Sequence, residues 1–152
     1  KDPEVINKVM TAFKEDPKLD YVSNTMIPTY PEGLDIEVFK FTALERAFRN
    51  ASLPSEREHV TPYIWKNVHF FKTKNITHSI DLSHIRLTVD TPRDLLLIRQ
   101  LADIHEEIIK MDLNDIDRIF KQYPDLLSIN SDIERNEGYK ISLTNEKFGK
   151  TE

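Results

Sequence analysis

The sequence contains no cysteine, which excludes disulfides, thiolate zinc sites and cysteine nucleophiles. Only three of its 152 residues are glycine, and it has no GxGxxG, Walker A or GxSxG motif. Three glycines are too few for the loop with which nucleotide enzymes usually cradle phosphates. The chain alone is therefore not expected to form a complete nucleotide-binding domain.

Long apolar runs and net positive charge are absent as well. No segment approaches the roughly 20 apolar residues that span a bilayer, and the first residues lack a basic and apolar secretion signal. The chain carries 21 Lys and Arg against 26 Asp and Glu, a formal net charge of −5, whereas nucleic-acid binding needs a basic face. We expect no membrane partner, no nucleic-acid partner and a cytoplasmic location.

The remaining composition is that of one folded domain, with 39% hydrophobic and 31% charged residues. The chain opens on Asp2-Pro3, which is a helix cap followed by Pro at the first helical position. A native chain rarely opens on a ready-capped helix. We therefore expect the later portion of a longer protein.

Apolar periodicity and capping signals predict the elements. Helices are expected over residues 3–15, 42–51, 55–65 (interrupted at Pro62), 92–110 and around 116–120, followed by a polar tail after Pro124. Leu44, Ala47, Phe48 and Ala51 should form the buried face of the second helix. Strands are expected over residues 20–24, 34–39, 69–72 and 85–89. Alternating strands and helices favour a layered α/β fold.

Asp90 is the strongest local candidate for chemistry. It ends the β-rich run that begins at Ile85, and Thr91-Pro92 then opens a helix. Ligands of α/β proteins bind at the carboxyl ends of strands, and a carboxylate there suits Mg²⁺. The alternative is that Asp90 caps the following helix or ends a turn, and the pattern leaves both open.

Two further groups carry weaker signals. Asp35 and Glu37 lie two residues apart and so share one strand face, where they could bind sugar hydroxyls or form the wet face of an edge strand. The charged run Ser55–Thr61 could contact a ligand or be a solvated helix turn. None of the five His residues has a tight metal-ligand spacing.

Several motifs together, in this order, resemble the second half of the spore-coat polysaccharide cytidylyltransferases, which belong with the acylneuraminate cytidylyltransferases. The motifs are residues 2–6 (DPEVI), 21–25 (YVSNT), 29–39 (TYPEGLDIEVF), 55–64 (SEREHVTPYI), 86–90 (RLTVD) and 136–139 (NEGY). The resemblance implies the second half of a Rossmann-like nucleotide-diphospho-sugar transferase fold, with a mixed sheet flanked by helices. It also implies residues 1–111 as the C-terminal half of the cytidylyltransferase domain and residues 112–152 as a helical and polar extension.

The family joins CTP to an acidic or otherwise activated sugar and releases pyrophosphate, so the resemblance implies CTP, such a sugar and Mg²⁺ as ligands of the whole protein. Asp90 matches the family's second metal-ligand position. Arg57, His59 and Arg86 are implied as contacts to a sugar carboxylate or phosphate, and Asp35 and Glu37 as selectors of sugar hydroxyls.

The family's Gly- and Arg-containing CTP loop, and the Gly-Asp motif with the first Mg²⁺ carboxylate, are not in this sequence. The chain alone is therefore expected to be inactive. An alternative is a non-catalytic sugar-binding or dimerisation module derived from the family. Related enzymes commonly dimerise after the first strands, so we expect a homodimer through loop 25–33, with Met26, Ile27 and Tyr30 projecting.

Overall fold

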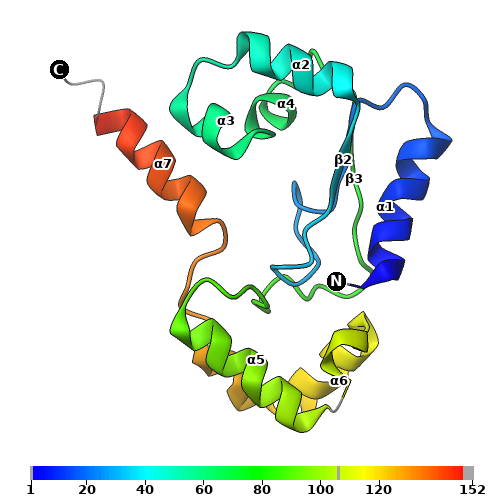
Figure 1. Cartoon of the computed structure of the whole chain (residues 1–152). Coiled ribbons are helices and arrows are strands. Elements are labelled where there is room, and N and C mark those ends of the chain that lie inside the picture. Colours follow the sequence, from blue (N-terminus) through cyan, green and yellow to red (C-terminus); the bar gives the residue numbers. More distant parts are fainter. Residues whose placement is uncertain (1, 106, 149–152) are drawn as a thin grey trace.

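The computed structural model describes residues 2–105 and 107–148, which form a mixed sheet with helices around it (Figure 1). The elements are α1 (Pro3–Glu15), β1 (Tyr21–Ser23), β2 (Glu37–Phe39), α2 (Phe41–Asn50), α3 (Pro54–His59), α4 (Pro62–Lys66), β3 (Thr73–Asn75), α5 (Pro92–Ile104), η1 (Ile108–Lys110), α6 (Leu113–Gln122), η2 (Pro124–Ile129) and α7 (Glu137–Phe148).

Strand β1 is the centre of the three-stranded sheet. It pairs antiparallel with β2 and parallel with β3, in the order β2-β1-β3. Its side chains alternate between the two faces: Val22 packs with Val9 of α1, whereas Tyr21 packs with Ala47 of α2 and Ile64 of α4. Helices thus cover both faces, and the predicted α/β class with a mixed, helix-flanked sheet is confirmed.

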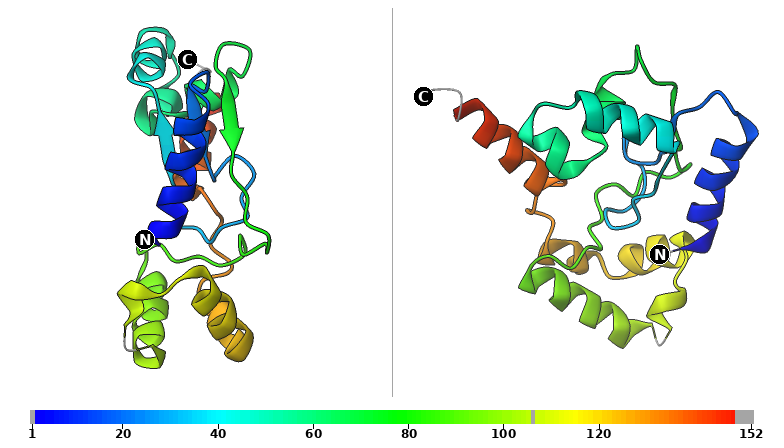
Figure 2. Two further views of the ribbon diagram at one scale, coloured as in Figure 1. Left: turned by 90° about the vertical axis from the view of Figure 1, so that its right-hand side faces the viewer. Right: turned by 45° about the horizontal axis from the view of Figure 1, so that its top comes forward.

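A further core joins α5, α6 and η2 at one end of the sheet, below it in Figure 1 and in both views of Figure 2. Leu97 and Leu101 of α5 pack there with Ile116 and Phe120 of α6. Helix α5 ends at Ile104, earlier than the predicted residue 110. The predicted division at residue 111 stays a prediction.

The prediction of a polar tail after Pro124 is wrong, because helix α7 forms there. Asn136 has a positive φ of 57° immediately before the helix, and α7 then packs against α3. Its Ser142 hydroxyl donates to Glu58 Oε2 at 2.7 Å, and the Ser55 backbone N–H donates to the Glu146 carboxylate. These partners lie more than 80 residues away in sequence, so local periodicity did not reveal the helix.

The strand expected over residues 85–89 is also wrong. Only one bridge forms, between Arg86 and Glu32, with Glu32 N–H donating to Ile85 O at 2.9 Å and Leu87 N–H to Glu32 O at 2.8 Å. The neighbours of Glu32 prevent a longer ladder: Pro31 has no N–H, and Gly33 turns the chain with a φ of +98°.

The strand expected over residues 69–72 begins instead at Thr73. Phe70 and Phe71 donate their backbone N–H groups to Asn67 O, at 2.8 and 3.2 Å, so this segment continues the turn that ends α4. The expected break at Pro62 is confirmed, since α3 and α4 are separate helices.

Two predicted details of burial are wrong. Phe48, assigned to the buried face of α2, is 68% exposed, and Ala43 is buried in its place. Tyr30, expected to project from loop 25–33, is 1% exposed and belongs to the core with Val5, while Ile27 in the same loop is 64% exposed.

Candidate functional site

A cavity of about 690 Å³ opens between β2, the α3–α4 corner and α7. Figure 1 shows α7 on the opposite side of the sheet from α1. Its volume lies in the range of small-molecule sites. It is lined by Thr25, Met26, Asp35, Glu37, His59, Thr61, Pro62, Trp65, Arg135, Asn136, Tyr139, Lys140 and Leu143. Three residues that the sequence singled out, Asp35, Glu37 and His59, therefore meet at one place.

Glu37 contributes a carboxylate held by two hydroxyls. The Tyr21 hydroxyl donates to Glu37 Oε1, and the Thr61 hydroxyl lies 3.0 and 3.2 Å from the two carboxylate oxygens. Burial, and next the neighbouring Glu37 charge, raise the pKa of Tyr21 well above its ordinary value, so Tyr21 stays a donor. A carboxylate has about four acceptor positions, which leaves Glu37 able to accept from a ligand hydroxyl.

Asp35 is paired across the cavity with the C-terminal segment. Arg135 Nη2 donates to Asp35 Oδ1, and Arg135 Nη1 donates to the backbone carbonyl of Tyr30 at 3.1 Å. The Gly33 N–H donates to the second Asp35 oxygen at 3.3 Å. Arg135 thereby fastens the segment before α7 to the loop before β2.

His59 ends α3 at the cavity. Its Nε2 lies 3.1 Å from Ser142 Oγ on α7, and its ring meets the Tyr139 ring edge-on with centroids 5.2 Å apart. The next residue, Val60, has φ 67° and ψ −57°, and Thr61 N–H bonds to His59 O across it at 2.8 Å. A β-branched residue in this tight turn is strained, and such strain concentrates at functional sites.

Aromatic rings form one wall of the cavity. Trp65 and Tyr139 lie with ring centroids 5.8 Å apart at 74°, and the Lys66 ammonium lies 5.4 Å from the Tyr139 centroid. The Tyr139 hydroxyl is buried and has no hydrogen-bond partner among the described residues. The site thus combines an apolar wall with converging polar groups.

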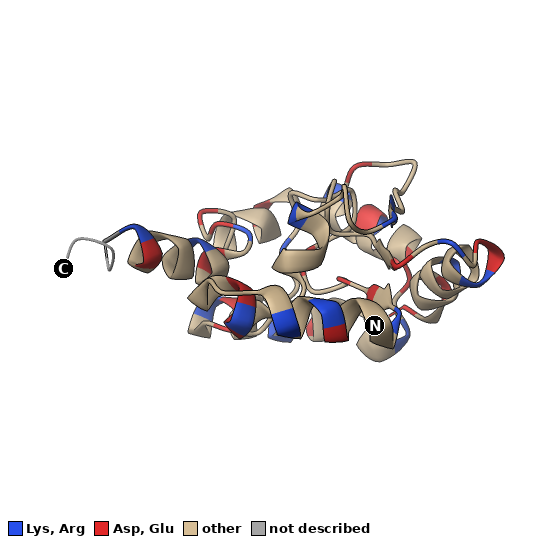
Figure 3. Ribbon diagram, turned by 90° about the horizontal axis from the view of Figure 1, so that it is seen from above, with Lys and Arg blue, Asp and Glu red and all other residues tan. Residues whose placement is uncertain are grey.

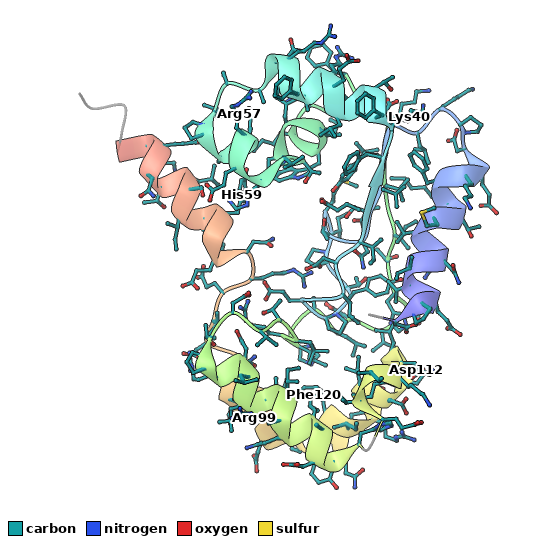
Figure 4. The ribbon with its side chains drawn as sticks, viewed as in Figure 1. Lys40, Arg57, His59, Arg99, Asp112 and Phe120 are labelled. Carbon is teal, nitrogen blue, oxygen red and sulfur yellow. The ribbon has the colours of Figure 1, made fainter. Side chains whose placement is uncertain are left out.

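Arg57 does not reach this cavity. Figure 4 shows His59 toward α7 and Arg57 farther along α3, toward α2. Arg57 Nη1 donates to Phe48 O at 3.1 Å and to Ala51 O at 3.3 Å, and its guanidinium lies over the Phe48 ring. Arg57 thus satisfies two backbone carbonyls at the C-terminal end of α2.

Arg86 also lies outside the cavity, in a buried cluster of carboxylates. Its guanidinium pairs with Glu32 at 2.9 Å, Asp90 at 2.9 Å and Asp94 at 3.0 Å. Burial alone would raise the pKa of Asp94, but hydrogen bonds from Arg86, Asn130 and two backbone N–H groups hold that pKa well below its ordinary value. The Arg86 guanidinium thus pairs with carboxylates of the protein itself and does not point into the cavity.

Asp90 stands at the edge of that cluster, with its side chain 68% exposed. The helix cap is Thr91, in a capping box with Asp94, so the alternative that Asp90 caps α5 is wrong. Among residues 2–105 and 107–148, no three His, Cys, Asp or Glu side chains gather as a metal cage. One exposed carboxylate still fits Mg²⁺, which takes one or two carboxylates together with substrate phosphates.

Other surfaces fit a polar ligand less well. A groove of about 440 Å³ beside α2 is lined mostly by apolar groups, including Phe41, Leu44, Phe48 and Val60. Figure 3 shows Lys and Arg interleaved with Asp and Glu along the helices.

In the part of the chain that the structure describes, no helix is long and apolar enough to cross a bilayer.

Sequence reasoning missed Arg135, Tyr139 and Lys140, which line the cavity from the C-terminal segment. The available signal was the motif at residues 136–139, which the pattern alone presents as a turn. Only the packing of α7 against α3 shows that these residues belong to the site.

Comparison with known proteins places this geometry in context. No family model matches the chain. An uncharacterised protein of Methanocaldococcus jannaschii is 39% identical over 139 residues, which are 90% of this chain and 55% of that protein. The solved structure of a cytidylyltransferase from Leptospira borgpetersenii serovar Hardjo-bovis superposes with a TM-score of 0.76 at 26% identity, covering 82% of this chain and 52% of that one.

The fold is nucleotidyltransferase-like. The chain spans about half the length of each of the two proteins that it matches. The specific spore-coat family stays a prediction.

Proposed function

We propose that this chain is the C-terminal, sugar-binding portion of a CTP-dependent sugar cytidylyltransferase that activates a sugar for surface polysaccharide synthesis. One observation carries the proposal: in a cytidylyltransferase-like fold, Asp35, Glu37 and His59 converge on a cavity with an aromatic wall. Carboxylates that accept from hydroxyls, beside rings that cover an apolar face, suit a sugar.

The chain's own residues would bind and orient the sugar. Glu37, fixed by Tyr21 and Thr61, accepts from a sugar hydroxyl, and Trp65 covers the C–H face of the ring. In the transfer, a sugar oxygen forms a bond to the α-phosphorus of CTP while the bond to pyrophosphate breaks, and its rate depends on positioning and charge neutralisation.

Asp90 would hold Mg²⁺ together with substrate phosphates and a second carboxylate, which the upstream half of the whole protein would supply. When bound, the metal neutralises charge that develops on the phosphates. Arg86, 2.9 Å from Asp90, fixes the direction of this carboxylate.

The second candidate is a non-catalytic sugar-binding or dimerisation module. The genomic sequence directly upstream of Lys1 discriminates the two. A Gly- and Arg-containing loop followed by a Gly-Asp motif supports the enzyme, and their absence supports the module.

The direct test of the enzyme is pyrophosphate release by the whole gene product with CTP, Mg²⁺ and a panel of sugars. Release that depends on one sugar supports the proposal, and no release with any sugar contradicts it. The chain by itself should bind CTP weakly, because its three glycines supply no phosphate loop. Micromolar CTP affinity of the chain by calorimetry would contradict this expectation.

We also propose a homodimer. Ile27, at 64% exposure, is the apolar side chain that loop 25–33 offers to a partner. Light scattering at tens of micromolar should give twice the chain mass, and a strictly monomeric mass would contradict the dimer.

A further inference from the structure

The Tyr139 hydroxyl is a polar group of the cavity lining that the described residues leave unsatisfied. The atom is buried and has no hydrogen-bond partner among residues 2–105 and 107–148. Leaving a buried hydroxyl without a partner is unfavourable, because the group loses its hydrogen bonds to water. Its neighbours on the cavity wall differ: Glu37, His59 and Arg135 all have partners within the protein.

The Tyr139 ring is held in place around this hydroxyl. It packs against His59 and Trp65, with centroids 5.2 and 5.8 Å away, and the Lys66 ammonium lies over it. Helix α7 is fastened in turn, because Ser142 bonds both to Glu58 and to His59 of α3. A ring fixed from several sides presents its hydroxyl to a ligand at little cost in entropy.

The polar groups of the lining suit a ligand that offers hydroxyl groups. The Glu37 carboxylate is held by two hydroxyls and can accept further hydrogen bonds. Arg135 pairs with Asp35 and Lys140 pairs with Glu134, and both cations keep further N–H donors. A sugar hydroxyl can both donate and accept, so it can bond to either kind of group.

On this basis we propose that α7 completes the sugar site and that the Tyr139 hydroxyl bonds a sugar hydroxyl. The proposal rests on the proposed function, which it deepens by naming a specificity-determining residue from the C-terminal segment.

The test is the Tyr139→Phe variant, which keeps the ring and removes only the hydroxyl. Binding of D-glucose, D-mannose, N-acetyl-D-glucosamine and D-glucuronate to the chain is measured by saturation-transfer NMR titration. We expect the variant to bind the preferred sugar of these four about three- to tenfold more weakly, as one hydrogen bond is lost. Its melting temperature without sugar should stay the same or rise, because no protein hydrogen bond is lost.

Tyr123→Phe is the matched control. Its hydroxyl accepts from Gln122 Nε2 at 3.2 Å, and Tyr123 directly follows helix α6, outside the lining of the cavity. Sugar affinity should not change in this variant.

Each contrary outcome has its own meaning. Unchanged sugar affinity in Tyr139→Phe, or a lowered melting temperature as its only effect, overturns the role of Tyr139 and leaves the proposed function intact. Binding of none of the four sugars by the wild-type chain overturns this proposal together with the sugar-binding role in the proposed function.

Discussion

Arg86 and Asp94 form a two-pronged buried ion pair: Nε lies 3.0 Å from Oδ1, and Nη2 lies 3.2 Å from Oδ2. Arg86 is 8% exposed and Asp94 is fully buried. Asn130 completes the cluster by donating to Asp94 Oδ1 at 2.8 Å and to Arg86 O at 3.2 Å. The pair therefore joins the segment before Asp90, helix α5 and the chain after η2 in one network.

Replacing Asp94 with Asn should lower the free energy of unfolding by about 3–5 kcal/mol, because Arg86 then keeps a buried charge without its main partner. Urea denaturation measures the change. The matched control is Asp132→Asn, which removes the partner of Arg93 in an exposed pair with contacts of 2.7 and 2.9 Å. A loss as large in the control as in Asp94→Asn would contradict the role of burial.

The same pair predicts how stability depends on pH. The pKa of Asp94 lies well below its ordinary value in the folded protein, so below about pH 4 the unfolded chain takes up this proton first. The stability from Asp94 is thus fully present above pH 4 and is lost as the pH falls toward the folded-state pKa. Melting temperatures from pH 7 to pH 2.5 should fall more steeply in the wild type than in Asp94→Asn, and parallel curves would contradict this.

Gly33 predicts a second stability effect, caused by backbone geometry. Its φ is +98°, and a Cβ there would lie 2.9 Å from Leu87 C and O. Gly33→Ala should destabilise the fold by about 1–3 kcal/mol. In Gly138→Ala, where a Cβ meets nothing within 4 Å, stability should stay the same or rise by up to about 1 kcal/mol. Denaturation of both variants decides, and equal effects would contradict the close contact at Gly33.

The parts of the fold that the sequence predicted correctly are those set by neighbouring residues. The Asp2 side chain caps α1 by accepting from Glu4 N–H at 2.8 Å, and Thr91 and Asp94 form the expected capping box. The apolar spacing of α1 placed Val5 and Val9 in the core. Such contacts lie within a few residues, so one stretch of sequence contains both partners.

The errors came from long-range pairing. Residues 85–89 have the composition of a strand, yet whether they form a ladder depends on Pro31 and Gly33 beside Glu32, over 50 residues away. Helix α7 is likewise defined by contacts with α3. Neither partner could be identified from the local pattern.

The candidate site was predicted only in part, because its lining residues come from segments far apart in the sequence. Asp35 and Glu37 both line the cavity, but the predicted strand over residues 34–39 begins only at Glu37, so Asp35 lies in the preceding loop and the expected shared strand face is wrong. Arg57 and His59 were grouped by composition alone, although residues two apart on a helix point to different sides. The structure places His59 on the cavity and Arg57 beside Phe48.

That separation predicts unequal effects on sugar binding. His59→Ala should weaken binding of the preferred sugar several-fold, because it removes a cavity wall and the contact with Tyr139. Arg57→Ala should leave the sugar affinity unchanged, since Arg57 contacts α2. The NMR titration described for Tyr139 measures both variants. Weakened sugar binding in Arg57→Ala but not in His59→Ala would contradict the assignment of the cavity.

The last prediction concerns Asp90 in the whole protein. Asp90→Asn keeps the size of the side chain and removes the charge that would hold Mg²⁺. Turnover should fall on the order of a hundredfold or more, since metal charge stabilises the transition state by several kcal/mol. The melting temperature should change little, because the side chain is 68% exposed and Arg86 keeps Glu32 and Asp94. A structural role gives the reverse, with activity per folded molecule retained and the melting temperature lowered. Measuring turnover and melting on this variant while Mg²⁺ is titrated separates the two, because loss of a metal ligand also raises the Mg²⁺ concentration needed for half-maximal rate.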